Sequence, residues 1–93
     1  MNVIEEIDHP TLQNHKIQFG ISSWTKDEAE ENKTESIRRA VYNEDGIFSP
    51  HGSSEIPMED MPLLIRECII RNKISINDMA DILDAISLSI RSR

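Results

Sequence analysis

The stretch Pro57–Arg93, PMEDMPLLIRECIIRNKISINDMADILDAISLSIRSR, decides the fold class of this chain. It contains two segments whose apolar residues recur at the i, i+3, i+4, i+7 spacing of an amphipathic helix. The apolar stripe of the first segment is Met61, Leu64, Ile65, Cys68 and Ile69, and that of the second is Met79, Ile82, Leu83, Ile86 and Ile90. The sequence therefore predicts a C-terminal antiparallel helix pair.

The turn between these two helices is marked by its own residues. Asn72 tolerates the left-handed conformation in which many helices stop. Ser75, followed three residues later by Asp78, matches a capping box, in which the serine hydroxyl accepts a hydrogen bond from a backbone N–H of the next helix. We therefore expect the first helix to end near Asn72 and the second to begin after Ser75.

The middle of the chain favours β-structure. In Lys16–Trp24, apolar and small or polar residues alternate, which is the period of a half-buried strand. Ser36–Tyr42 fits either a strand or a helix by its apolar spacing. The turn residues Asn43–Gly46 and the β-friendly residues after them favour a hairpin, with a third strand at Ile47–Ser49.

Two segments contain few apolar residues. Met1–His15 fits either one helical turn, stopped by Pro10, or a flexible arm at the end of the chain. The segment 25–35, TKDEAEENKTE, has Ala29 as its one apolar residue. Charged segments with so few apolar residues stay unpacked, so we expect an exposed acidic linker there.

Together these elements predict an α+β fold in one small domain, residues 1–93. The expected architecture is a small three-stranded antiparallel sheet packed against the C-terminal antiparallel helix pair. Only 38% of the residues are hydrophobic and 4% are aromatic, so the core must be small and aliphatic. The side chains expected to fill it are Ile17, Ile21, Ile37, Ile47, Ile65, Ile69, Ile82 and Ile86.

The charge balance and the single cysteine limit the function classes. Ten basic and 17 acidic residues give a net charge of -7, which argues against nucleic-acid binding and suits a partner with a basic surface. Cys68 lies on an apolar helix face, where a buried reduced thiol is expected. No apolar run approaches the roughly 20 residues of a membrane span, and Met1–Ile7 is too short and acidic for a signal peptide. A cytoplasmic location is expected.

The polar loop before the helix pair is the best candidate ligand site. Its serines and backbone N–H groups could meet an anion, with bidentate contacts from nearby arginines and stacking on an aromatic ring. The candidate residues are Arg38, Arg39, Tyr42, His51, Ser53 and Ser54. A phosphate-bearing ligand such as a nucleotide would fit this chemistry, although neither GxxxxGK[ST] nor GxGxxG occurs. The competing interpretation is an ordinary hairpin-to-helix connection.

Catalysis and metal binding are not expected. His9, His15 and His51 are far from one another in sequence and from Cys68, whereas zinc needs three or four ligands at close spacing. No residues fill the nucleophile, base and orienting roles together, so we predict no catalytic residue, no metal and no cofactor. Two helices joined by a short turn with a capping serine resemble the start of a DNA-binding helix-turn-helix. The carboxylates of Asp78, Asp81 and Asp84, however, would repel the DNA phosphates.

Three apolar residues lie off the main helix stripes, namely Leu63, Ile70 and Leu88. Two helices on a small sheet need not cover them, and contiguous uncovered apolar surface marks an interaction site. The sequence therefore predicts a non-enzymatic cytoplasmic binding or regulatory protein, acting through protein–protein contacts or as a homo-oligomer. The alternative is a small-ligand binder that captures a phosphate-bearing molecule.

Overall fold

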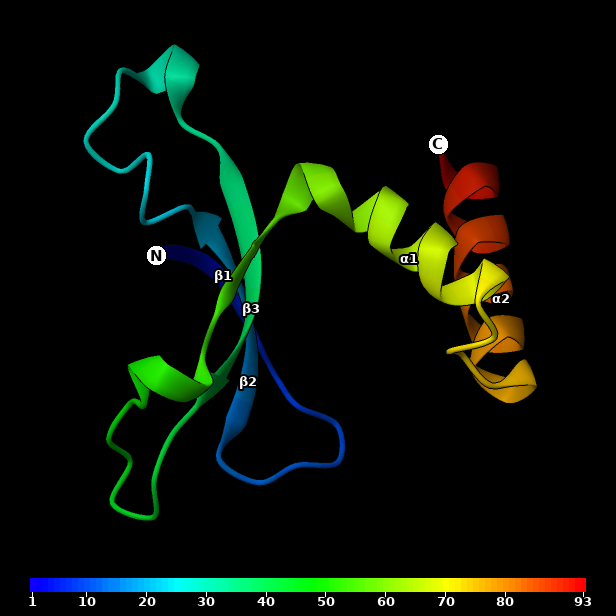
Figure 1. Cartoon of the computed structure of the whole chain (residues 1–93), viewed down its shortest axis with the longest axis horizontal. Coiled ribbons are helices and arrows are strands. Elements are labelled where there is room, and N and C mark those ends of the chain that lie inside the picture. The colour runs from blue at the N-terminus through cyan, green and yellow to red at the C-terminus, as the bar shows by residue number, and fades with distance from the viewer. The chain divides into compact units, whose positions relative to one another are not determined.

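A computed structural model describes all residues, 1–93. The chain divides into two compact units, Met1–Met61 and Pro62–Arg93, and each is described by itself. The first, the sheet unit, contains the β-strands and three short 3-10 helices, and the second, the helical unit, contains the α-helices (Figure 1). The α+β class predicted from the sequence is confirmed. Whether the helix pair packs on the sheet stays a prediction.

The sheet has four strands, so the predicted three-stranded sheet is wrong. The strands are β1 (Asn2–Asp8), β2 (His15–Ile21), β3 (Glu35–Val41) and β4 (Glu55–Pro57), in the order β1-β2-β3-β4. Every neighbouring pair is antiparallel. The predicted strands at Lys16–Trp24 and Ser36–Tyr42 correspond to β2 and β3, which resolves the choice between strand and helix for the latter.

The additional strand is β1, where the sequence indicated a helical turn or a flexible arm. A register shift between Val3 and Glu5 interrupts the pairing of β1 with β2. This irregularity breaks the alternation of side chains, so the apolar residues of β1 do not follow a period of two. The segment is held by its pairing with β2 and not by burial, because all seven of its residues are exposed.

The predicted third strand, Ile47–Ser49, is also wrong. The turn before it forms as expected: Asn43 Oδ1 accepts hydrogen bonds from the N–H groups of Asp45 and Ile47, and Gly46 has a φ of 78°. Beyond the turn, only the isolated bridge between Tyr42 and Phe48 forms. Pro50 then begins a 3-10 helix, Pro50–Gly52, and pairing with β3 resumes at β4. Proline has no N–H to donate to a ladder, so the strand cannot continue there.

The sheet unit has a polar centre instead of the predicted isoleucine core. Alternate residues of a strand lie on opposite faces, and the register aligns Glu6, Gln18, Arg38 and Glu55 across all four strands. The opposite face carries apolar side chains in register, namely Ile7, Ile17, Phe19, Ile37 and Ile56. The only buried hydrophobic residue is Ala40, whereas Gln18, Ser22, Ser36 and Ser53 are buried.

The acidic segment 25–35 lies at the surface of the sheet unit. Residues 26–32 are exposed and include the 3-10 helix Glu30–Asn32. Its two ends are tied together, because the Thr34 N–H donates to Thr25 Oγ1 and the Thr34 hydroxyl donates to Ser22 Oγ. The segment is therefore a closed loop between β2 and β3.

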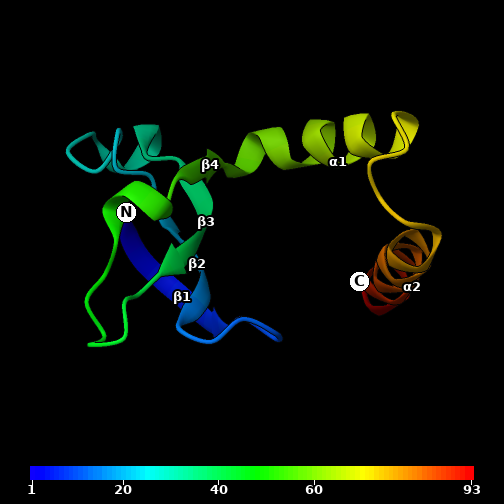
Figure 2. The ribbon, with the colours of Figure 1, turned by 60° about the horizontal axis from the view of Figure 1, so that its bottom comes forward.

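The helical unit contains α1 (Met61–Ile70) and α2 (Ile76–Ser92), and the 3-10 helix Met58–Asp60 leads into α1. Both helices were predicted, but they are not antiparallel. α1 lies across Figure 2 while α2 is seen nearly along its axis, so the two helices cross steeply. Neither helix contains a buried residue.

The turn between the helices confirms both predicted boundaries. Asn72 has a φ of 57°, its N–H donates to the Ile69 carbonyl, and the Lys73 N–H donates to the Cys68 carbonyl. These two bonds form a Schellman motif around a left-handed residue. Ser75 then caps α2, and its hydroxyl oxygen accepts a hydrogen bond from the Asp78 N–H at 3.1 Å.

Replacing Asn72 tests this stop. Asn72→Ala should lower the stability of the helical unit by about 1 kcal/mol. The left-handed conformation has a higher free energy for alanine than for asparagine, whose short polar side chain forms local hydrogen bonds. Asn72→Gly should leave stability unchanged within about 0.5 kcal/mol, since glycine adopts this φ freely but is more disordered when unfolded. Urea unfolding followed by circular dichroism at the helix band measures both. Equal stability of the two variants would contradict the proposed role of the φ value.

Candidate functional site

The structure separates the two arginines of the predicted phosphate site. Arg38 and Arg39 are consecutive residues of β3, so their side chains leave the sheet on opposite faces. Arg38 is engaged within the sheet unit: its Nε donates to Gln18 Oε1 at 2.8 Å, and its Cζ lies 4.5 Å from the centroid of the Phe48 ring. Arg39 is exposed. A ligand cannot receive both guanidinium groups together.

Of the other predicted ligand residues, Tyr42 and Ser53 form hydrogen bonds within the sheet unit, and His51 and Ser54 are exposed. Tyr42 Oη accepts a hydrogen bond from Gln18 Nε2 at 3.1 Å, and its ring lies 5.7 Å from that of Phe48. The buried Ser53 hydroxyl donates to the Ser49 carbonyl and accepts from the Val41 N–H, which ties the loop to β3. His51 and Ser54 are exposed. Of the six residues, Arg38 and Tyr42 share one hydrogen-bonded cluster through Gln18.

This cluster is completed by charged residues of β1 and β2. Gln18 Nε2 donates to Glu6 Oε2 at 2.6 Å, and Lys16 Nζ lies 3.1 Å from Glu6 Oε1 and 3.6 Å from Asp8 Oδ1. The hydrogen bonds from Gln18 and then Lys16 lower the pKa of Glu6, and the hydrogen bond to Glu6 raises the pKa of Lys16. Every buried side-chain nitrogen and oxygen has a hydrogen-bond partner. The cluster therefore holds the strands together and leaves no buried donor free for a ligand.

Glu55 is a second polar centre, and no sequence pattern indicated it. Its Oε1 accepts hydrogen bonds from the Ser23 N–H at 3.1 Å and the Ser36 hydroxyl at 2.9 Å, and its Oε2 lies 3.5 Å from the Met1 amino group. Burial raises the pKa of Glu55, but the bonds from Ser23 and Ser36 and the positive amino group outweigh it, so the pKa is lowered. These partners come from three separate segments, which is why spacing along the sequence could not reveal them.

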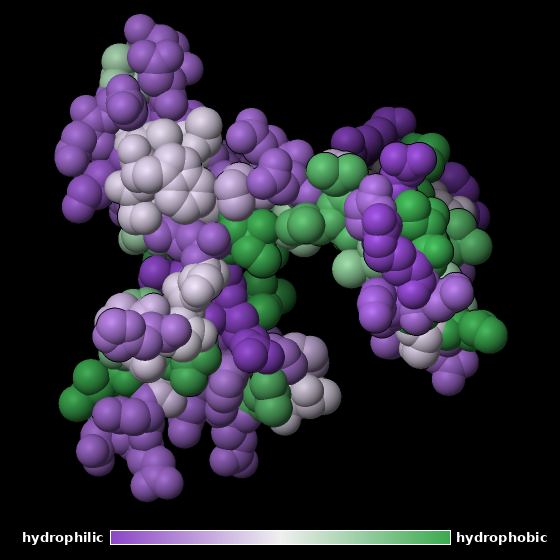
Figure 3. Space-filling model, in the orientation of Figure 1, coloured by the Kyte–Doolittle hydropathy of each residue, from purple (hydrophilic) through white to green (hydrophobic).

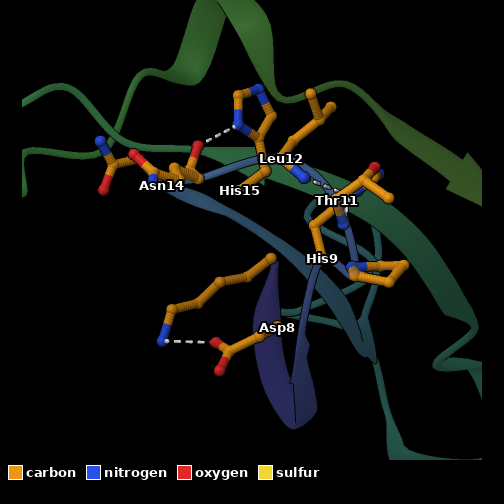
Figure 4. Close-up of a pocket in the computed structure, with 9 residues that line it drawn as sticks. Asp8, His9, Thr11, Leu12, Asn14 and His15 are labelled. Atoms are coloured by element: carbon orange, nitrogen blue, oxygen red, sulfur yellow. Dashed lines mark hydrogen bonds and ion pairs between the residues drawn. The ribbon is translucent and has the colours of Figure 1, made fainter.

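The β1–β2 hairpin forms an open pocket of about 360 Å³, lined by residues 8–16 (Figure 4). His9 Nδ1 accepts hydrogen bonds from the N–H groups of Thr11 at 3.2 Å and Leu12 at 3.0 Å. His15 Nδ1 lies 2.7 Å from the Gln13 carbonyl, to which it donates. The two imidazole rings are edge to face, with centroids 6.2 Å apart. The histidines thus shape the hairpin loop, a role that their sequence positions did not indicate.

The same hydrogen bonds fix the tautomers of the two neutral histidine rings. Because Nδ1 of His9 accepts, the proton of the neutral ring is on Nε2, and neither nitrogen has a free lone pair for a metal. Because Nδ1 of His15 donates, its Nε2 is a free acceptor. The two neutral rings therefore differ, because His9 keeps an Nε2 N–H donor and His15 keeps an Nε2 acceptor.

The helical unit presents its apolar residues to solvent (Figure 3). The residues predicted as an interface, Leu63, Ile70 and Leu88, are exposed, at 55%, 58% and 63%. Five of the ten main-stripe residues, all expected in the core, are exposed as well, and the other five are half-buried. On α2 these include Leu83 at 65%, Ile86 at 50% and Ile90 at 69%, and Ile76 reaches 81%. The apolar surface of α2 is therefore wider than the sequence analysis predicted.

Five residues of α2 form a continuous apolar row, which we call the α2 seam: Ile76, Met79, Leu83, Ile86 and Ile90. Their spacings of three, four, three and four residues are those of the a and d positions of a coiled coil. Leu88 lies off the seam, because five residues at about 100° each place it about 140° around the helix from Leu83. The heptad spacing is visible in the sequence, but only the exposure shows that the helical unit does not itself bury the seam.

No α-helix of the chain has the length and apolar character needed to cross a membrane. Comparison with known proteins adds no further constraint: no family model, no curated protein and no solved structure matches the chain. The candidate sites therefore rest on the geometry of this chain.

Proposed function

We propose that this chain is a non-enzymatic binding protein that holds a protein partner through the α2 seam. The observation that carries the proposal is the exposure of four seam side chains, Ile76, Leu83, Ile86 and Ile90, along the whole of α2. Burying one such side chain fully gives about 1.5–3 kcal/mol, so a partner that covers the seam gains several kcal/mol. Exposed apolar surface arranged in one row is typical of a protein-interaction site.

The mode of binding that fits this surface is helix to helix. An apolar row at heptad spacing receives the matching row of another helix, with side chains of one inserted between those of the other. The acidic composition and the single reduced cysteine suit a cytoplasmic protein. The alternative of a phosphate-binding protein loses its main support, because Arg38 and Arg39 lie on opposite faces of the sheet.

Site-specific photo-crosslinking tests the proposed surface. A photoreactive phenylalanine analogue at position 83, in cells that express the chain, should give an adduct with a second polypeptide. The same analogue at position 88 should give at least about tenfold less, because Leu88 is equally exposed but lies off the seam. Denaturing electrophoresis and mass spectrometry measure the adducts. Equal yields at both positions, or an adduct at 83 only within the same chain, would refute the proposal.

A further inference from the structure

We infer that His9 is a pH-sensitive switch of the β1–β2 hairpin: its neutral ring holds the loop 10–13 closed, and its protonated ring releases the loop. The inference concerns the sheet unit and does not depend on the proposed function of the α2 seam. It has three supports, which are the few hydrogen bonds that hold the loop, the nitrogen atom that His9 uses, and the charges beside its ring.

The loop 10–13 depends on two histidine rings for every hydrogen bond that it forms. The N–H groups of Thr11 and Leu12 donate to His9 Nδ1, and His15 Nδ1 donates to the last carbonyl of the loop. Next to the loop, the backbone N–H of His9 donates to the His15 carbonyl at 3.0 Å. Loss of the bonds to the His9 ring would therefore open the loop and leave β1 paired with β2.

His9 holds the loop through an acceptor atom, and protonation removes that acceptor. In the protonated imidazole both ring nitrogens are donors, so Nδ1 would point an N–H at the N–H groups of Thr11 and Leu12. The Thr11 hydroxyl, 3.4 Å from Nδ1, can accept from the protonated ring, but it restores neither backbone bond. Because the closed loop needs the neutral ring, acid favours the open loop. The change falls in the range of about pH 5–8, where imidazoles change charge.

His15 responds differently, although it holds the same loop. Its Nδ1 is a donor in the hydrogen bond to the Gln13 carbonyl, and it remains a donor when the ring is protonated. Protonation of His15 therefore preserves its bond. The opening of the loop by acid is assigned to His9 alone.

The charged groups beside the two rings act on the same equilibrium. Asp8 precedes His9, and its carboxylate lies 3.6 Å from Lys16 Nζ. Arg39 of β3 lies on the face of the sheet that carries the His15 side chain. The ring centroids are 6.2 Å apart, so protonation of both histidines brings two positive charges together. Of these groups only Asp8 favours a protonated His9, and it shares its charge with Lys16.

Amide hydrogen exchange of the full chain, at about pH 7.5 and about pH 5, tests the switch. The exchange rate of each amide in an unstructured peptide, divided by the measured rate, gives its protection at that pH. Protection of the Thr11 and Leu12 amides should fall at least about tenfold at the lower pH, because two hydrogen bonds are lost. The amides of β2 and β3 should keep their protection. Unchanged protection of Thr11 and Leu12, or an equal loss throughout β2 and β3, would overturn the inference.

Two asparagine variants separate His9 from its neighbour. In His9→Asn the amide oxygen occupies the place of Nδ1 along the side chain and accepts at every pH, so protection of the loop amides should be the same at both pH values. His15→Asn removes the other titratable ring and keeps a donor, so the loop amides should lose protection as in the natural chain. An equally large loss in His9→Asn, or no loss in His15→Asn, would contradict the role of His9.

Discussion

Gly20→Ala should lower the free energy of unfolding of the sheet unit by about 3 kcal/mol or more, beyond the usual range for overpacking. Gly20 lies in β2 opposite Val3 of β1. A Cβ at this position would lie 2.1 Å from the Asn2 carbonyl oxygen and 2.9 Å from Val3 Cα. Both neighbours are backbone atoms, so no side-chain rotation relieves the clash and β1 must leave its position.

Urea unfolding followed by tryptophan fluorescence measures this loss, and hydrogen exchange of the β1 amides shows whether β1 separates from β2. The matched control is Gly52→Ala, whose added Cβ would meet its nearest atom at 3.6 Å, an ordinary contact. We expect it to change stability by less than about 0.5 kcal/mol. If both variants unfold at the same urea concentration as the natural chain, β1 does not pack over Gly20.

Glu55→Ala should lower the stability of the sheet unit by about 2–3 kcal/mol, because it leaves the buried Ser36 hydroxyl without its acceptor and removes the hydrogen bond from the Ser23 N–H. The Ser36 hydroxyl, whose residue is fully buried, and the Ser23 N–H both donate to Glu55 Oε1. The Glu55 side chain itself is only 11% exposed. Glu55→Gln keeps an acceptor oxygen for both donors and loses the ion pair with the Met1 amino group, so it should cost about 1 kcal/mol.

The pH dependence of stability measures how much the negative charge of Glu55 contributes, apart from its role as a hydrogen-bond acceptor. Its pKa is lowered in the folded chain, so its carboxylate contributes stability above the unfolded value of about 4.5. This contribution disappears as the pH falls below about 4.5 through the lowered folded pKa, because the protonated form loses the charge-assisted bonds. Urea midpoints from pH 7 to pH 3 should therefore fall less steeply for Glu55→Gln than for the natural chain.

Glu44→Gln is the control for this pH series, because Glu44 is exposed in the turn Asn43–Gly46. It should reproduce the pH dependence of the natural chain. A Glu55→Gln variant whose stability falls with acid as steeply as that of the natural chain would show that the Glu55 carboxylate contributes no charge-dependent stability.

The sequence was most informative where the physics is local. The Schellman motif at Asn72 and the cap at Ser75 involve residues within five positions of each other, so the pattern alone located the end of α1 and the start of α2. The alternation in β2 and the turn at Asn43–Gly46 are equally local, and both were predicted. The candidate phosphate site combined Arg38 and Arg39 by their closeness in sequence, but these residues are consecutive in one strand, and a strand places consecutive side chains on opposite faces.

By itself, then, the sequence determined two helices, the stop of the first and the N-cap of the second, two strands and the α+β class of this protein. Tertiary structure decided the rest. β1 became a strand through pairing with β2 across a register shift, and Glu55 gained partners from three distant segments. The register placed a polar row across the sheet, and the isoleucines expected in a core lie on the opposite face or in the helices, except for the exposed Ile47 after the turn. Pairing and burial depend on contacts between residues far apart in the chain, and no local pattern records which of these contacts form.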